Sequence, residues 1–223
     1  MERICFEVNE AQRVSALLEV PPSARAAFVL AHGAGAGMNH PFMDAVALGL
    51  LERDVATLRY QFPFMENGSK RTDLPALAQA TVRAAVDEAS AQLFGMPLFA
   101  GGKSFGARMT SHAQAAQPLP GVRGIAFLGF PLHLADRPST VRSQHLARVT
   151  CPMLFLQGTR DKLADTTLVE SVVQSLGARA TLESIDQADH AFHVLVRSGR
   201  TDAQVLQQML DALARWIEGV LRA

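Results

Sequence analysis

Short apolar segments alternate with helical patterns along most of this chain, and this alternation limits its fold more than any other feature of the sequence. The apolar segments are too short to be helices, and they are typical of strands that are buried on both faces. Strands that alternate with helices form a parallel sheet with a layer of helices on each side. Eight strands are expected, at residues 4–8, 13–20, 27–31, 55–60, 97–101, 122–129, 153–157 and 180–185.

The helical patterns complete a doubly wound, mostly parallel α/β architecture. The first two strands alternate more clearly between apolar and polar residues, which suits an antiparallel edge of the sheet. No linker or internal repeat divides residues 1–223, so the sequence predicts a single domain. Apolar residues recur at helical spacing from about Pro41 onward and over 75–93, 104–116, 166–176 and 202–221.

The composition excludes several kinds of partner. Lys plus Arg and Asp plus Glu both number 21, so no net field attracts nucleic acid or an anionic membrane. The amino terminus has no apolar signal core, and no apolar run is long enough to span a bilayer. Cys5 and Cys151 are too few for a disulfide framework or a metal site with sulfur ligands. We expect a reduced, cytoplasmic protein, and the sequence leaves its oligomeric state open.

The strand at 97–101 runs into Gly102-Lys103-Ser104-Phe105-Gly106. This G-x-S-x-G pattern is typical of a sharp strand-to-helix turn that exposes a serine, with glycines where side chains would collide with neighbouring elements. The letters Gly-Lys-Ser also end a nucleotide-binding loop, but that motif needs a glycine at position 97, which is Pro97. We therefore interpret Ser104 as a candidate nucleophile and reject the nucleotide site.

A serine nucleophile needs a base, and the base needs a carboxylate that orients it. Such groups collect at the carboxyl ends of the strands in sheets of this kind. Asp161 follows the strand at 153–157, with Asp165 as a rival that is better placed to cap the next helix. His190 follows the last strand, with His193 as its competitor. The chain order Ser, Asp, His favours Ser104, Asp161 and His190.

A glycine-rich loop, HGAGAG at 32–37, follows the third strand. It lacks the G-x-G-x-x-G spacing of a dinucleotide loop, and no acidic residue ends the next strand. Backbone amides of this loop and of the residue after the nucleophile can stabilise an oxyanion, which assigns Ala34 and Phe105 to that role.

These four motifs, in this order, resemble those of the α/β-hydrolase superfamily over nearly the whole chain. The glycine loop and the stretches 59–63 (RYQFP) and 129–133 (GFPLH) are similar to a narrower group, the small dienelactone-hydrolase-like predicted hydrolases. The resemblance implies an eight-stranded sheet and a triad of Ser104, Asp161 and His190. Dienelactone hydrolase itself has a cysteine nucleophile where this chain has Ser104, so its particular chemistry is not carried over. The group also includes a scaffold-type subunit of a nuclear chromatin complex.

The sequence predicts a hydrolase of small carboxylic esters or thioesters that works through an acyl-enzyme and needs no metal or cofactor. The alternatives are a small peptidase or amidase, and a non-catalytic interaction module. The segment 130–150 is too short for a substantial lid, so we expect an open or shallow pocket. Phe62 either forms an apolar wall of that pocket or packs in the core, and Lys103 and Arg59 either attract an anionic group or form structural salt bridges. The sequence does not identify the acyl group or the leaving group of the substrate.

Overall fold

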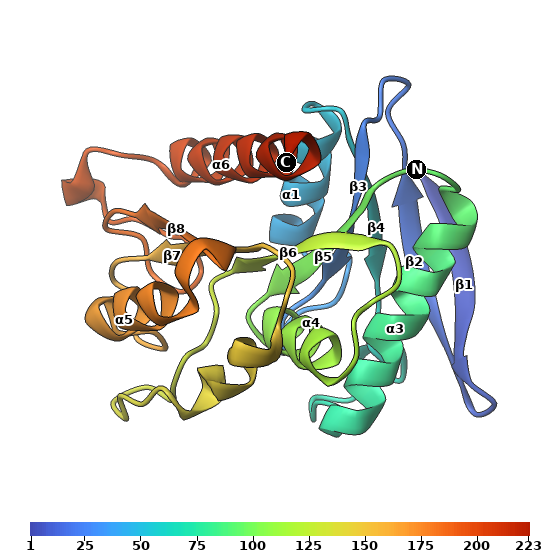
Figure 1. Ribbon diagram of the computed structural model, residues 1–223, viewed down its shortest axis with the longest axis horizontal. Coiled ribbons are helices and arrows are strands. Elements are labelled where there is room, and N and C mark those ends of the chain that lie inside the picture. The colour runs from blue at the N-terminus through green and yellow to red at the C-terminus, as the bar shows by residue number, and fades with distance from the viewer.

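The computed structural model describes residues 1–223 and is built on one eight-stranded sheet (Figure 1). The strand order across the sheet is β1-β2-β4-β3-β5-β6-β7-β8, with antiparallel pairing of β1 with β2 and of β2 with β4. All other neighbouring strands are parallel, which confirms the mostly parallel sheet with an antiparallel edge. The strands are β1 (Glu2–Asn9), β2 (Gln12–Glu19), β3 (Ala26–Ala31), β4 (Val55–Tyr60), β5 (Leu98–Lys103), β6 (Val122–Leu128), β7 (Met153–Gly158) and β8 (Ala180–Ile185).

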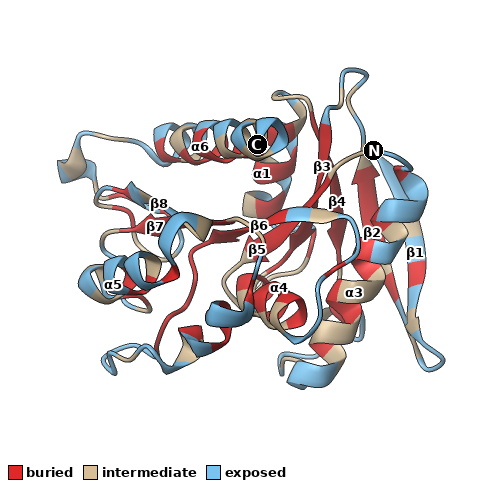
Figure 2. Ribbon diagram, in the orientation of Figure 1, coloured by how far each residue is buried: buried red, intermediate tan, exposed pale blue.

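Helices cover both faces of the sheet (Figure 1). One face is covered by α1 (Pro41–Leu51) and α6 (Asp202–Arg222). The other is covered by α3 (Pro75–Gln92), α4 (Phe105–Ala116) and α5 (Thr166–Leu176). The central strands are therefore buried along their whole length between the two layers (Figure 2).

Alternate residues of one central strand serve two separate cores. In β3, Phe28 and Leu30 pack with the residues of α1 and α6, whereas Ala27 and Val29 pack with those of α3 and α4. Successive side chains of a strand point to opposite faces, so a strand with helices on both sides must be apolar throughout. This is the physical reason why the apolar segments of the sequence show no alternation.

The turn from β5 to α4 has the predicted sharp geometry. Strand β5 extends to Lys103, two residues beyond the predicted end, and α4 begins at Phe105. Ser104 between them has φ +52° and ψ −108°, an unusual conformation for a residue with a side chain. A Cβ on Gly106 would lie 2.6 Å from the carbonyl oxygen of His32, and a Cβ on Gly102 would collide with the carbonyl of Ala31. The two glycines therefore allow β3 to approach the turn closely.

The segment between β6 and β7 contains the 3₁₀ helix η1 (Val141–Arg148) and no inserted helical cap. Besides η1, three one-turn helices were not predicted: α2 (Pro63–Glu66), η2 (Gly177–Arg179) and η3 (Val196–Ser198). Helices this short contain too few residues to show a periodic apolar pattern. No helix of the structure is both long enough and apolar enough to cross a membrane.

Candidate active site

The carboxyl ends of β5, β7 and β8 bring three side chains from distant parts of the chain into one hydrogen-bonded row. The Nε2 atom of His190 lies 2.8 Å from Oγ of Ser104. The Nδ1 atom of the same ring lies 2.6 Å from Oδ2 of Asp161. A carboxylate only accepts hydrogen bonds, so Nδ1 carries a proton and Nε2 is left to accept from the serine hydroxyl. A base in this state can take a proton from Ser104.

Asp161 is held from several directions. Its side chain is fully buried. Besides His190, the side-chain amide of Gln157 donates to Oδ2 at 2.6 Å, and the backbone amide of Leu163 donates to Oδ1 at 2.8 Å. These donors stabilise the charged carboxylate inside the protein, where an unpaired charge would be very costly. Asp161 thus presents a fixed acceptor to His190.

The two rival residues serve other purposes. Oδ1 of Asp165 accepts from the backbone amide of Leu168 at 3.1 Å, which makes Asp165 the N-cap of α5. His193 is exposed, and its Nδ1 lies 2.8 Å from Oδ2 of Asp202. The hydrogen bond that His193 donates to the carboxylate of Asp202 raises the pKa of His193 above its ordinary value. The structure therefore brings Asp161 and His190, but neither rival, to Ser104.

The loop after β3 runs beside the serine. A Cβ on Gly33 would lie 3.8 Å from Cβ of Ser104, so the loop and the serine are within contact distance of each other. The backbone amide of Ala34 makes no hydrogen bond within the protein. Phe105 is the first residue of α4, so its amide has no acceptor within the helix, and it makes no other backbone hydrogen bond. Both amides expected to bind an oxyanion are thus free donors.

His32 fixes the position of this loop. Its ring Nδ1 donates to the carbonyl of Gly33 at 2.7 Å, and Nε2 accepts from the amide of Phe62 at 3.0 Å. Burial lowers the pKa of His32 to about 4, so the ring is neutral at physiological pH. A neutral ring has one donor and one acceptor nitrogen, and both are used here. His32 therefore joins the glycine loop to the end of β4.

A pocket of about 300 Å³ opens at Ser104 and His190. No residue of the segment 130–150 lines it, in agreement with the absence of a lid. Most of its surface is apolar, and its volume suits a small ligand. The lining comes from the glycine loop, the start of α1 and the loops after β5, β7 and β8: Gly33, Ala34, Gly35, Ala36, His40, Phe42, Met43, Lys103, Ser104, Leu163, His190 and Ala191.

Two of the three residues expected to shape the pocket lie elsewhere. Phe62 is completely buried and packs against the rings of His32 and Phe105, so it belongs to the core and not to a pocket wall. Arg59 is also buried and forms ion pairs with Glu19 and Asp44. Its guanidinium is therefore occupied in a structural salt bridge and does not face a ligand.

Lys103 does line the pocket, but its ammonium is engaged by other groups of the protein. Nζ donates to the backbone carbonyl of His190 at 2.5 Å and lies 5.2 Å from the centre of the Phe192 ring. The expected attraction of an anionic group by Lys103 is thus replaced by a contact inside the protein.

Sequence reasoning missed Gln157 and Leu163, the two supports of Asp161, and it also missed Phe42 in the pocket. Gln157 had a detectable signal, because it is a polar residue near the end of a strand that is otherwise apolar. Its Oε1 atom also accepts from the amide of Phe130 at 2.9 Å, so this one side chain joins two loops at the site. Leu163 acts through its backbone, which the sequence does not mark.

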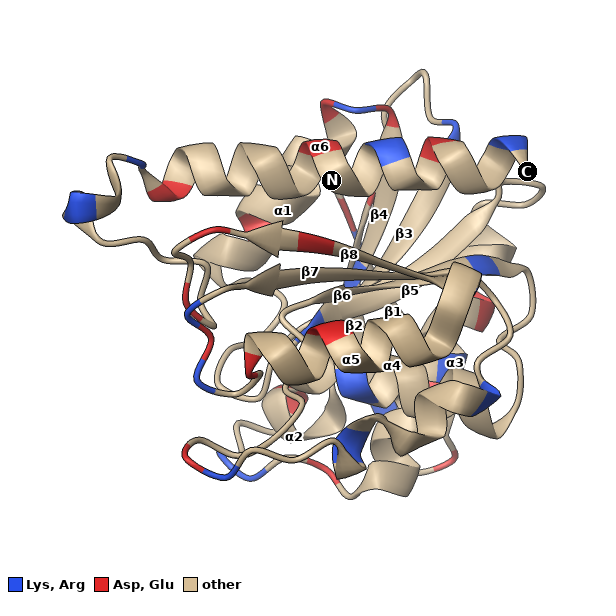
Figure 3. Ribbon diagram, turned by 60° about the vertical axis from the view of Figure 1, so that its left-hand side comes forward, with Lys and Arg blue, Asp and Glu red and all other residues tan.

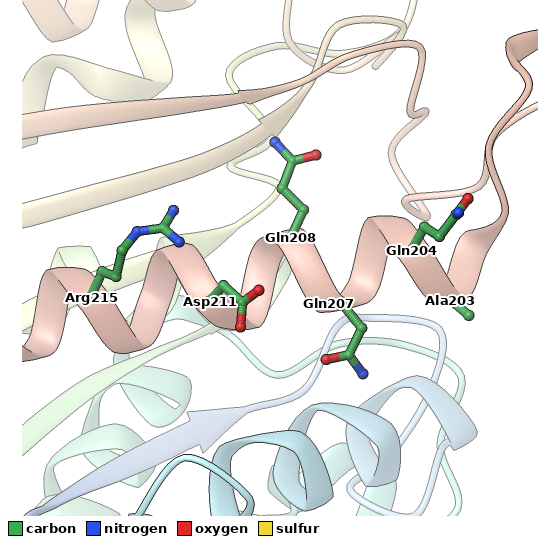
Figure 4. Close-up of a pocket in the computed structure, with 6 residues that line it drawn as sticks. All are labelled: Ala203, Gln204, Gln207, Gln208, Asp211 and Arg215. Carbon is green, nitrogen blue, oxygen red and sulfur yellow. The ribbon is translucent and has the colours of Figure 1, made fainter.

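A larger hollow, of about 470 Å³, lies along α6 and carries no such chemistry (Figure 4). Three of its polar side chains are engaged in hydrogen bonds: Gln207 and Asp211 accept from Arg53, and Gln208 donates to Glu183. The hollow holds neither a nucleophile nor a histidine. We therefore place the candidate site at Ser104.

The charges on α6 do not form a patch of one sign. Acidic and basic residues are both present along the exposed face of α6 (Figure 3). No group of three or more His, Cys, Asp or Glu side chains is arranged to hold a metal ion.

The comparisons with known proteins agree with this fold. Dienelactone hydrolase from Anabaena variabilis is 19% identical, with 98% of this chain and 96% of that chain covered and a TM-score of 0.77. An α/β serine hydrolase without a lid, from Xanthomonas campestris, is 20% identical, with 96% and 94% covered and a TM-score of 0.74. Est1E from Butyrivibrio proteoclasticus, in a structure with ferulic acid bound, is 17% identical, with 95% and 99% covered and a TM-score of 0.73.

At these identities the similar structures establish the architecture and leave the substrate open. The sequence match is more specific, because the family model for an alpha/beta hydrolase domain matches residues 24–218. That range includes the glycine loop, Ser104, Asp161 and His190. The chain belongs to the alpha/beta hydrolase domain family.

Proposed function

We propose that this protein is a serine hydrolase that cleaves small carboxylic esters or thioesters through an acyl-enzyme on Ser104. The observation that carries the proposal is the continuous row of hydrogen bonds from Ser104 through His190 to Asp161. A serine hydroxyl is a weak nucleophile until a base accepts its proton, and this row supplies the base with its correct tautomer.

In the first half-reaction, Oγ of Ser104 attacks the carbonyl carbon of the ester while its proton passes to Nε2 of His190. The backbone amides of Ala34 and Phe105 donate to the oxyanion of the tetrahedral intermediate. Each such donor is worth roughly 3–4 kcal/mol of barrier in enzymes of this type. His190 then gives the proton to the leaving alcohol or thiol, and the acyl group stays on Ser104.

In the second half-reaction, His190 takes a proton from water, and the resulting hydroxide attacks the acyl carbon. Collapse of this intermediate returns the proton to Oγ of Ser104 and releases the carboxylic acid. Asp161 stabilises the imidazolium in both halves without itself taking the proton. Gln157 and Leu163 keep the carboxylate in place while the charge on the ring changes.

The pocket favours small, uncharged ester groups. Its apolar surface and volume of about 300 Å³ suit a short acyl chain or a single aromatic ring. Arg59 and Lys103, the cations expected to attract an anion, are engaged within the protein. The similar structure of Est1E with ferulic acid bound is in keeping with a small aromatic ligand.

The test is covalent labelling by a fluorophosphonate probe, followed by a screen of short acyl esters. Labelling is expected in the wild type and lost in Ser104→Ala and His190→Ala. Ser111→Ala is the matched control, because Ser111 Oγ lies 2.8 Å from Nε2 of His145, the same distance as in the proposed site. The Ser111 hydroxyl donates instead to the carbonyl of Arg108, so this variant should label normally.

A folded wild type that neither labels nor hydrolyses any short ester would overturn the proposal. The interaction module would then be the better interpretation of the fold.

A further inference from the structure

Lys103 is a cation in the interior of the protein, next to the proposed nucleophile. The residue keeps some contact with solvent at the pocket, but its charged end is buried. Lysine is rarely buried unless it is paired, yet none of the ion pairs of the protein includes Lys103. The proposed ester hydrolysis does not use the charge of Lys103. A buried charge is costly, so a lysine at this position needs another role.

The Nζ atom of Lys103 contacts the loop that carries His190, the proposed base. Its hydrogen bond to the carbonyl oxygen of His190 is 2.5 Å long. The ring of Phe192, two residues further on, lies 5.2 Å away in a position that favours a cation. The lysine thus holds the loop that carries His190 at two points, one on each side of Ala191.

The end of β6 leaves room for this arrangement. Gly129 has φ +74°, a conformation that favours glycine. A Cβ at this position would lie 3.0 Å from Nζ of Lys103 and 3.5 Å from Cε1 of His190. The missing side chain therefore leaves space for both the ammonium and the imidazole.

The charges that face the ammonium come from two loops. Asp161, after β7, and Asp189, after β8, both favour the protonated amine. Burial opposes them and has the larger effect, so that the pKa of Lys103 falls to about 8. The remaining groups in contact are the Phe192 ring and the His190 carbonyl. The ammonium is therefore the main form at neutral pH and is lost within the next pH unit or two.

We propose that Lys103 is a positioning residue for His190, and that its ammonium anchors the backbone of the base so that Nε2 meets Oγ of Ser104. This inference rests on the proposed function. Because Lys103 and Ser104 are adjacent in the turn after β5, one short stretch of backbone fixes both the nucleophile and the carbonyl of its base. Small displacements of a catalytic group are costly, since a misplacement of about 1 Å can lower the rate roughly 100-fold.

The first test replaces Lys103 by methionine, which keeps most of the volume and removes the charge and the donor. We expect kcat/KM of Lys103→Met for a short ester to fall about 10- to 100-fold. The thermal midpoint should not fall, because a buried cation is replaced by an apolar side chain. Lys70→Met, at an exposed lysine, is the matched control and should match the wild type in both measurements.

The dependence of kcat/KM on pH distinguishes a role of the Lys103 charge in positioning His190 from a role of its side chain in packing alone. In the wild type, kcat/KM should decline above about pH 8 as the ammonium loses its proton. This decline should be absent from Lys103→Met and present in Lys70→Met. A Lys103→Met enzyme with the activity and pH profile of the wild type would overturn the proposal.

A second measurement needs neither substrate nor variant. The chain has only three lysines, Lys70, Lys103 and Lys162, so ¹⁵N-lysine NMR gives three side-chain resonances. One resonance should titrate near pH 8, and the downfield signal of the His190 proton shared with Asp161 should shift over the same range. An unchanged His190 signal through the lysine titration would contradict the proposed anchoring. If the wild type hydrolyses no ester, the proposed function fails, while this titration still decides whether Lys103 positions His190.

Discussion

The side-chain amide of Gln157 donates to Oδ2 of Asp161, the same oxygen that accepts from His190. One carboxylate oxygen thus receives two hydrogen bonds of 2.6 Å, one from the strand β7 and one from the loop after β8. Gln157 is four residues before Asp161, and its own Oε1 accepts from the amide of Phe130. The orientation of the carboxylate is therefore linked to the loops that follow β6 and β7.

We expect Gln157→Leu to lower kcat/KM by roughly tenfold, since loss of a hydrogen bond to a buried charge costs about 1–3 kcal/mol. The free energy of unfolding, measured in urea, should fall by a similar amount. Gln174→Leu, at an exposed glutamine of α5, is the control and should change neither value. Wild-type activity in folded Gln157→Leu would show that Leu163 alone is sufficient to orient Asp161.

Asp161→Asn and Asp165→Asn should separate the orienting carboxylate from the helix cap. We expect Asp161→Asn to lower kcat by roughly 10³–10⁴-fold, because an amide no longer selects the required histidine tautomer. Asp165→Asn should retain its activity and lose little stability, since asparagine also caps helices well. Steady-state kinetics and thermal unfolding of both variants give the comparison, and equal losses of activity would contradict the assignment of Asp161.

Stability should fall as the pH drops below about 6.5, because of His32. Its pKa is about 4 in the folded protein against 6.5 for an exposed histidine, so between these values the unfolded chain binds more protons. His32 thus contributes stability above pH 6.5 that is lost toward pH 4, by about 3 kcal/mol in all. Urea unfolding from pH 7 to 4 measures this slope. His32→Gln should be less stable at pH 7 and show a smaller slope, whereas an equal slope would rule out His32 as its source.

Short acyl chains should be hydrolysed faster than long ones, and neutral esters faster than anionic esters of the same size. The pocket is small and apolar, and Lys103, the one cation that lines it, is engaged within the protein. Phe42→Ala enlarges the pocket and should raise the preference for longer chains by roughly tenfold. Phe94→Ala, at a phenylalanine that is 96% exposed, is the control. A p-nitrophenyl ester series measures the preference, and faster turnover of long chains by the wild type would contradict the assignment of this pocket.

The sequence by itself determined the architecture. Apolar strands without alternation require cover on both faces, and the helical periods between them supply that cover, so the doubly wound sheet followed from local patterns. The turn at Ser104 could also be predicted, because Gly102 and Gly106 are required by close backbone approach and not by any distant side chain. Chain order then singled out Asp161 and His190 as candidates for a row with Ser104.

Only the tertiary structure decided which side chains meet. Asp161 and Asp165 are four residues apart, and His190 and His193 three, so the path of each loop selects between them. The same is true of Lys103 and Arg59, whose partners come from strands and loops far away in the sequence. Local sequence patterns determine which segments form helices, strands and turns. A hydrogen bond between distant loops depends instead on strand order, register and burial. For that reason the fold followed from the sequence, and the contacts of Gln157, Lys103 and Phe62 did not.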